Sequence, residues 1–198
     1  LTNALASFVP STLVASVSCH DVRARVQREE WIDPNDGYLY ARTLISEPPF
    51  RMAVHAKNYD GVRWRSIYLG GAYYETAVHN RFLKILKDQP SQLVIDVGMN
   101  IGYYTMLSAT LGHSVIGFEI NPANLMRLCE SLDLNQMGST SPVAFFQRGV
   151  SNVDDQTLQL VVPKNPGQAT FVVADSSPRA AGSSVDDSSV TTITLDTF

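Results

Sequence analysis

Residues 93–105, LVIDVGMNIGYYT, are the stretch from which we predict the fold class of this chain. An apolar run reaches Asp96, passes through Gly98 and Gly102, and continues directly into a helical pattern. This order is typical of the first strand, turn and helix of an open parallel α/β sheet, where ligands bind at the carboxyl ends of the strands. We therefore expect a ligand cleft beside Asp96. Gly98 would let the backbone approach the ligand, and Gly102 would permit close approach at the helix start.

The flanking segments have the spacing of a βαβαβ unit, which predicts an α/β fold with a parallel central sheet. A buried strand is expected at 92–97 and further strands at 113–119 and 143–147. Helices are expected at 75–88, 103–111 and 122–137, the last with Pro122 in its first turn. The apolar face of the 75–88 helix would comprise Val78, Phe82, Leu83, Ile85 and Leu86. After the third strand we expect an antiparallel hairpin of 157–162 and 168–173, a Ser-rich loop at 175–189 and a strand at 190–195.

Glu119 ends the second expected strand, 23 residues after Asp96. This is close to the offset of about 20 residues at which an acidic residue holds ribose hydroxyls in nucleotide-binding units. The turn itself departs from the dinucleotide pattern, because its glycines are four residues apart and Asn100 lies between them. The Asp96 carboxylate would repel a pyrophosphate but would attract S-adenosyl-L-methionine, whose ammonium and sulfonium are positive. Asn100 either adopts a left-handed backbone or contacts the ligand.

Residues 96–105 and 118–122 resemble the motifs of the FkbM family of S-adenosylmethionine-dependent methyltransferases. The resemblance covers residues 67–198, and Met99 stands where the family usually has Ala. Further similar segments are Gly70–Glu75, Leu134–Asn135, Arg148–Ser151 and Thr194–Asp196.

The resemblance implies a Rossmann-like class I methyltransferase fold and O-methylation of a hydroxyl on a sugar or secondary metabolite. The turn 96–102 would hold the methionine part of the cofactor, Glu119 the ribose and Ile120 the adenine face, with residues 147–149 beside the adenine edge. The family continues into a further strand, Lys-Ile-Asp-x-Glu-Gly-x-Glu, that this sequence does not contain. We therefore expect a 1–66 lead-in and, at 67–198, the donor-binding N-terminal part of a methyltransferase domain, with its C-terminal strands missing and its catalytic base unknown.

Two other function classes remain open from the sequence. The same site could serve an NAD- or nucleotide-sugar-binding oxidoreductase, or the chain could be a truncated, non-catalytic binding module. A net charge of −4 excludes the broad basic surface of non-specific nucleic-acid binding. No apolar run reaches the ~20 residues of a membrane span. The resemblance to the FkbM family implies a small-molecule or glycan acceptor. Oligomeric state and compartment stay open, and the uncharged first twenty residues are either a signal remnant or an ordinary linker.

The remaining candidate side chains are expected to be structural. Cys19 and Cys129, 110 residues apart, are expected to be reduced thiols, and no metal site is expected. His79 would lie with Glu75 on one side of its helix, and His113 would fill a helix-to-strand turn. Tyr103 and Tyr104 are expected to pack in the core.

Overall fold

The computed structural model is an α/β fold, and the residues that it describes are 19–20, 40–42, 49–55, 75–137, 142–161, 170–173 and 185–197. Its strands are β1 (Tyr40–Arg42), β2 (Arg51–Ala53), β3 (Leu93–Val97), β4 (Ser114–Phe118), β5 (Val143–Phe146), β6 (Arg148–Val150), β7 (Thr157–Val161), β8 (Thr170–Val173) and β9 (Val185–Ile193). Its helices are α4 (Thr76–Asp88), α5 (Tyr103–Thr110), α6 (Pro122–Leu134) and the 3-10 turn η3 (Leu195–Thr197). The expected boundary between residues 66 and 67 and the segment 70–74 lie outside the described residues.

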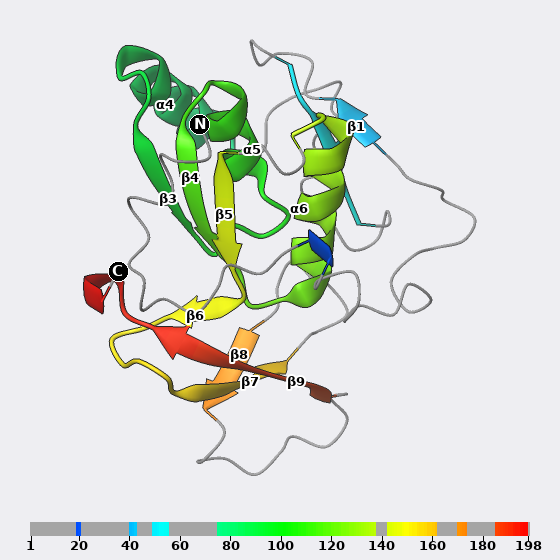
Figure 1. Ribbon diagram of the computed structural model, residues 1–198, viewed down its shortest axis with the longest axis vertical. Coiled ribbons are helices and arrows are strands. Elements are labelled where there is room, and N and C mark those ends of the chain that lie inside the picture. Colours follow the sequence, from blue (N-terminus) through cyan, green and yellow to red (C-terminus); the bar gives the residue numbers. More distant parts are fainter. Residues whose placement is uncertain are drawn as a thin grey trace.

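The parallel sheet that we expected is present, with strand order β3-β4-β5 (Figure 1). Asp96 lies opposite Gly117, Val97 lies opposite Phe118, and Phe118 in turn lies opposite Phe146. This register puts the last residues of all three strands at one edge of the sheet. The two predicted acidic strand ends therefore belong to neighbouring strands.

Helices α5 and α6 cover one face of this sheet, where most of the apolar core lies. The fully buried side chains there include Met106, Leu107, Leu125 and Leu128. Asn121 caps α6 by accepting a hydrogen bond from the Ala123 N–H over 2.9 Å, and Pro122 follows in the first turn as expected. Both helices end before the residues expected from the sequence, at Thr110 and Leu134.

The opposite face of β3 is not buried, which corrects the expectation of a buried strand. Leu93, Ile95 and Val97 are 36%, 45% and 50% exposed, because β3 is the edge strand of the described sheet and β6 and β9 pack only against its neighbours. The predicted apolar face of α4 is also partly wrong, since Val78 and Ile85 are about half exposed. The exposed side chains of Leu93, Ile95 and Val97 therefore form an apolar surface along β3.

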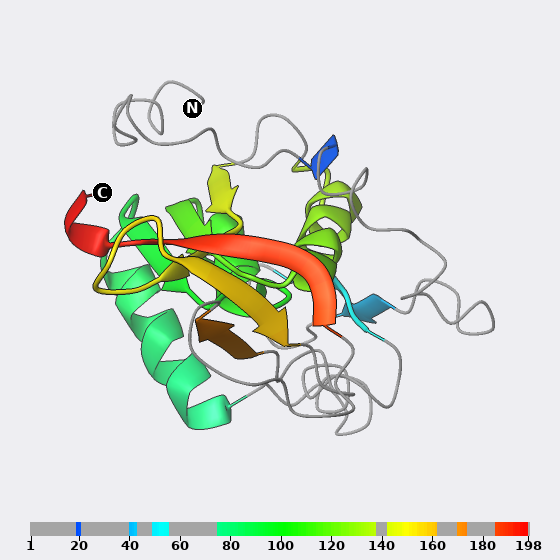
Figure 2. The same ribbon diagram turned by 90° about the horizontal axis from the view of Figure 1, so that it is seen from below.

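A second sheet, with order β6-β9-β7-β8, lies at the carboxyl ends of the parallel strands (Figures 1 and 2). The expected hairpin is confirmed, because β7 pairs antiparallel with β8, but its turn lies outside the described residues. The strand β6 was not expected. Two further corrections concern β9, which occupies residues 185–193, so that 185–189 are strand rather than loop and the strand ends before residue 194.

The upstream strand β2 is held against α6 by side chains of the helix. The Arg51 N–H donates to Asn135 Oδ1 over 2.9 Å, and Asn135 Nδ2 donates back to the Arg51 carbonyl over 2.6 Å. The Ala53 N–H donates to Ser131 Oγ over 2.9 Å. These polar residues satisfy strand groups that a neighbouring strand would otherwise pair.

Cys19 and Cys129 form a disulfide with a Cα–Cα separation of 5.4 Å, which corrects the expectation of reduced thiols. Cys129 is fully buried in α6, and Cys19 packs against the same core. Separation along the chain was a poor guide, because folding brings the two residues together.

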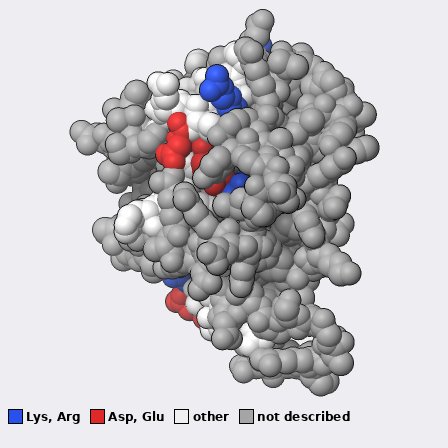
Figure 3. All heavy atoms as spheres, turned by 90° about the vertical axis from the view of Figure 1, so that its right-hand side faces the viewer, with Lys and Arg blue, Asp and Glu red and all other residues white. Residues whose placement is uncertain are grey.

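The described charges on the face that Figure 3 presents form a few small groups of both signs. The described part of that face therefore has no continuous basic patch. Within the ranges given above, no helix is both long and apolar enough to cross a bilayer.

Candidate functional site

The Asp96 carboxylate points from the end of β3 toward helix α5, where Thr105 Oγ1 donates to Asp96 Oδ2 over 2.6 Å. Burial raises the pKa of Asp96, while hydrogen bonds from the side chain and backbone of Thr105 act in the opposite direction. Thr105 is fully buried, so this contact anchors the carboxylate at its strand end. The bond was not expected from the sequence, although Thr105 lies at the end of the motif that we used.

The turn after β3 is closed by its own backbone hydrogen bonds. Both Gly98 and Met99 donate their N–H to the Phe118 carbonyl, over 2.9 and 3.1 Å, and the Gly102 N–H donates to the Met99 carbonyl over 2.9 Å. Gly98 and Gly102 have φ values of +70° and +86°, which residues other than glycine rarely adopt. The two glycines are therefore required by the backbone of this turn.

Asn100 occupies the centre of the turn in the left-handed region, at φ +54°. Its own Oδ1 accepts the Ile101 N–H over 2.7 Å, and its N–H donates to Glu119 Oε2 over 2.9 Å. The left-handed backbone that we considered is present. The two remaining N–H groups of the turn, those of Asn100 and Ile101, thus also have acceptors, and the turn is tied to the end of β4.

Glu119 is buried and accepts hydrogen bonds from two segments. Its Oε1 receives the Asn121 N–H over 2.8 Å and Asn124 Nδ2 over 3.3 Å, and its Oε2 receives the Asn100 N–H. Burial raises the pKa of Glu119, opposed first by the Asn121 and then by the Asn100 hydrogen bond. Its position just before α6 also places negative charge near the positive end of the helix dipole. Glu119 therefore braces the turn against the start of α6.

A buried polar chain leads from Glu119 to the upstream segment. Nε2 of His55 lies 2.8 Å from Oδ1 of Asn124, whose Nδ2 contacts Glu119. His55 lies two residues after β2 and is buried. Sequence analysis missed both His55 and Asn124, because they are 69 residues apart and neither belongs to a recognisable motif.

The glycines of this region have different neighbours. A Cβ added at Gly98 would meet no atom within 4 Å, whereas one at Gly102 would lie 2.6 Å from Leu128 Cδ1. One added at Gly117 would clash with Met99 Sδ. The space beside Gly98 is therefore open, whereas Gly102 serves the packing of α5 on α6. Met99 fills the room that Gly117 leaves in β4, which accounts for the larger residue at this position.

Ile120 follows Glu119 and is half-buried against the second sheet, where its Cγ2 lies 3.6 Å from the Cβ position of Gly149. Gln147 Nε2 donates to the Ile120 carbonyl over 3.4 Å, a long bond. The structure thus brings Ile120 beside residues 147–149, the two segments that the resemblance places around an adenine.

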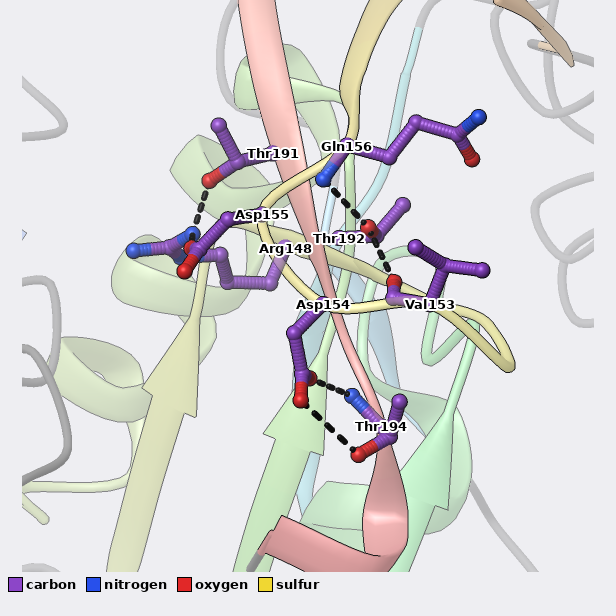
Figure 4. A network of polar contacts seen from close by, with 8 residues as sticks. All are labelled: Arg148, Val153, Asp154, Asp155, Gln156, Thr191, Thr192 and Thr194. Atoms are coloured by element: carbon purple, nitrogen blue, oxygen red, sulfur yellow. Dashed lines mark hydrogen bonds and ion pairs between the residues drawn. The ribbon is translucent and has the colours of Figure 1, made fainter.

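A polar network holds the connection after β6 against β9 (Figure 4). Asp154 accepts the Thr194 N–H over 2.5 Å, and Thr192 Oγ1 donates to the Val153 carbonyl over 2.6 Å while accepting the Gln156 N–H over 3.0 Å. On the other side, Arg148 contacts Thr191 Oγ1 and Asp155. Residues 148–150 therefore lie beside residues 191–193 of β9, which the segment 194–196 follows directly in the chain.

The histidines flanking the site are structural. His79 is fully buried and its Nδ1 lies 3.0 Å from the Tyr103 hydroxyl, so its partner is Tyr103, whereas Glu75 contributes only a backbone carbonyl to the helix. Burial lowers the pKa of His79. His113 joins α4 to β3, because its Nδ1 accepts the Gln92 N–H and its Nε2 donates to the Leu86 carbonyl. Tyr103 and Tyr104 pack edge to face, as expected for core residues.

No protein-family model matches the chain, and no curated protein matches it. One solved structure, wild-type Trm5b from Pyrococcus abyssi, aligns with a TM-score of 0.31 and 16% identity over 59% of this chain. The aligned part is 40% of Trm5b. An alignment this weak supports no conclusion about the chain.

Proposed function

We propose that the chain binds S-adenosyl-L-methionine at the carboxyl ends of β3 and β4 and belongs to a methyltransferase. The single observation that carries this proposal is the internal hydrogen bonding of the turn between β3 and α5. All five N–H groups of residues 98–102 already have acceptors within the protein. A dinucleotide site needs free N–H groups for the pyrophosphate, whereas this turn offers none and lies between two carboxylates.

The residues around the turn suit a cationic adenosyl ligand. Asp96, held by Thr105, would attract the ammonium of the methionine part. Open space beside Gly98 leaves room for the methionine part of the cofactor. Glu119 would accept a ribose hydroxyl, and Ile120 would contact the adenine. The bound cofactor supplies an electrophilic methyl group, and the chain contributes binding and orientation, which account for much of the acceleration of a transfer reaction.

The class of methyl acceptor is proposed from the family resemblance alone. On the resemblance to the FkbM family, the acceptor is a hydroxyl of a sugar or secondary metabolite, and the chain is the donor-binding part of the domain. An alcohol acceptor needs a general base as its proton leaves. None of the described residues is assigned to that role.

Calorimetry with S-adenosylhomocysteine and with NAD tests the proposal. We expect S-adenosylhomocysteine to bind the 198-residue chain and NAD to give no heat. Asp96→Asn should weaken binding, since it removes the charge but keeps an acceptor for Thr105. Asp88→Asn, at the exposed end of α4, is the matched control for loss of one negative charge. Binding of NAD but not of S-adenosylhomocysteine would favour the oxidoreductase instead.

A further inference from the structure

We propose that His55 is a positioning residue for the ribose-binding carboxylate, acting on Glu119 through Asn124. This inference rests on the proposed cofactor site and deepens it. It makes the segment after β2 part of that site, although it precedes the turn by more than forty residues in the sequence.

The orientation of the Asn124 amide depends on its two neighbours, Glu119 and His55. An asparagine can turn either its oxygen or its nitrogen toward a neighbour, and an oxygen facing the Glu119 carboxylate would be repelled. In the structure the nitrogen faces Glu119 Oε1 and the oxygen faces His55 Nε2 at 2.8 Å. Because an amide oxygen only accepts, His55 must carry its proton on Nε2 and donate. His55 therefore selects the amide orientation that suits the carboxylate.

The hydrogen bonds to Glu119 differ in how readily a ribose hydroxyl could replace them. The Asn100 and Asn121 N–H groups reach Glu119 over 2.9 and 2.8 Å and belong to the turn and the start of α6, so they cannot leave without distorting both. The Asn124 contact is longer, 3.3 Å, and comes from a side chain. A hydroxyl that approaches Oε1 would displace this donor most readily. His55 keeps Asn124 oriented while the exchange occurs.

His55, Asn124 and Glu119 are all buried. Hydrogen bonds with a charged partner in such surroundings are strong, and removing a donor leaves the remaining polar atoms without compensation. Loss of the His55 donor leaves the Asn124 oxygen without this partner and should let the amide move away from Glu119 Oε1. The carboxylate then recognises hydroxyls less well.

The test compares two ligands, S-adenosylhomocysteine and its 2′,3′-dideoxyribose analogue. The wild-type chain should prefer the hydroxylated ligand by on the order of tenfold or more, since a charge-assisted hydrogen bond is lost with the analogue. His55→Leu should reduce that preference by roughly threefold or more, and His55→Gln, which can still donate to Asn124, should restore it. A purely structural role would weaken both ligands equally and leave the ratio unchanged.

His113→Leu is the matched control, because it removes another buried histidine that bridges two segments but has no hydrogen bond to Asn124 or Glu119 in the described structure. It should leave the preference as in the wild type. Should His55→Leu fail to fold, nitrogen-15 spectra of the wild-type chain provide a second measurement. The His55 Nε2–H and Asn124 amide signals should shift when S-adenosylhomocysteine is added.

The outcomes separate this inference from the proposed function. Absence of any binding by the wild-type chain overturns both. Binding with an unchanged preference in His55→Leu, or with unmoved His55 and Asn124 signals, overturns the positioning role alone. Binding without any preference for the hydroxylated ligand overturns the role of Glu119 and with it that of His55.

Discussion

A Cβ added to Gly102 would lie 2.6 Å from Cδ1 of Leu128, so the turn before α5 packs closely on helix α6 at a point where any larger residue would require Leu128 to shift. The same residue has φ +86°. Two independent constraints, backbone conformation and packing, therefore act on one position.

Gly102→Ala should lower the free energy of unfolding by about 2 to 4 kcal/mol, because it adds overpacking to the cost of a left-handed residue. Gly112 has the same φ but open space around its Cβ position. Gly112→Ala is thus a matched control and should cost only about 1 to 2 kcal/mol. Urea unfolding of both variants checks this, and equal losses would show that Leu128 moves aside freely.

Gly98→Ala should affect ligand binding more than folding. The added Cβ meets no atom within 4 Å, so the loss of stability should equal that of Gly112→Ala. Because the methyl group would extend into the space proposed for the cofactor, affinity for S-adenosylhomocysteine should fall on the order of tenfold or more. Calorimetry measures the affinity, and unchanged binding would place the ligand elsewhere.

Thr105→Val should move the pH dependence of cofactor binding. The Thr105 hydroxyl lowers the pKa of Asp96, so its removal raises that pKa further. The ionised form attracts the cationic ligand, and affinity should therefore fall off at a higher pH than in the wild type. Thr110→Val, which removes a hydroxyl bonded only to carbonyls of the same helix, should keep the wild-type profile.

The contribution of Asp96 and Glu119 to stability should decline as the pH rises above the ordinary carboxyl range of about 4. Burial raises the pKa of Asp96 and Glu119 in the folded chain. The stability that their protonated forms contribute is complete below the unfolded pKa and is lost as the pH passes through the folded pKa. Asp96→Asn should flatten this decline in urea unfolding between pH 4 and 8, and a slope identical to the wild type would contradict the assignment.

Reduction of the disulfide should destabilise the chain. Cys19 and Cys129 close a loop spanning 110 residues, for which chain entropy predicts about 4 to 5 kcal/mol. Cys19→Ser should lower the melting temperature under oxidising conditions and make it insensitive to reductant. A wild-type melting temperature that does not respond to reductant would argue against the bond.

The parallel sheet could be predicted because its signals are local. The apolar run before Asp96, the glycine turn and Pro122 at a helix start each depend on near neighbours in sequence. The same holds for the left-handed conformation of Asn100. Local pattern therefore located both acidic strand ends and the turn between them.

What the sequence could not show depends on partners distant in the chain. Whether Ile95 is buried depends on what covers the outer face of β3, and the bond between Cys19 and Cys129 depends on how the first segment packs. The same is true of His55, whose partner lies 69 residues away. Four of the five strand residues at 185–189 are Asp or Ser, which have low strand propensity or favour loops, and pairing with β7 overrode that local preference.

The internally bonded turn at residues 98–102 also bears on how a ligand arrives. Because its amide protons already have acceptors, the conformational entropy of ordering this loop is spent during folding and not at the moment of association. Its amides should consequently exchange slowly with deuterium before any ligand is added. Association should then proceed at a rate set by diffusion and orientation, with no preceding loop rearrangement.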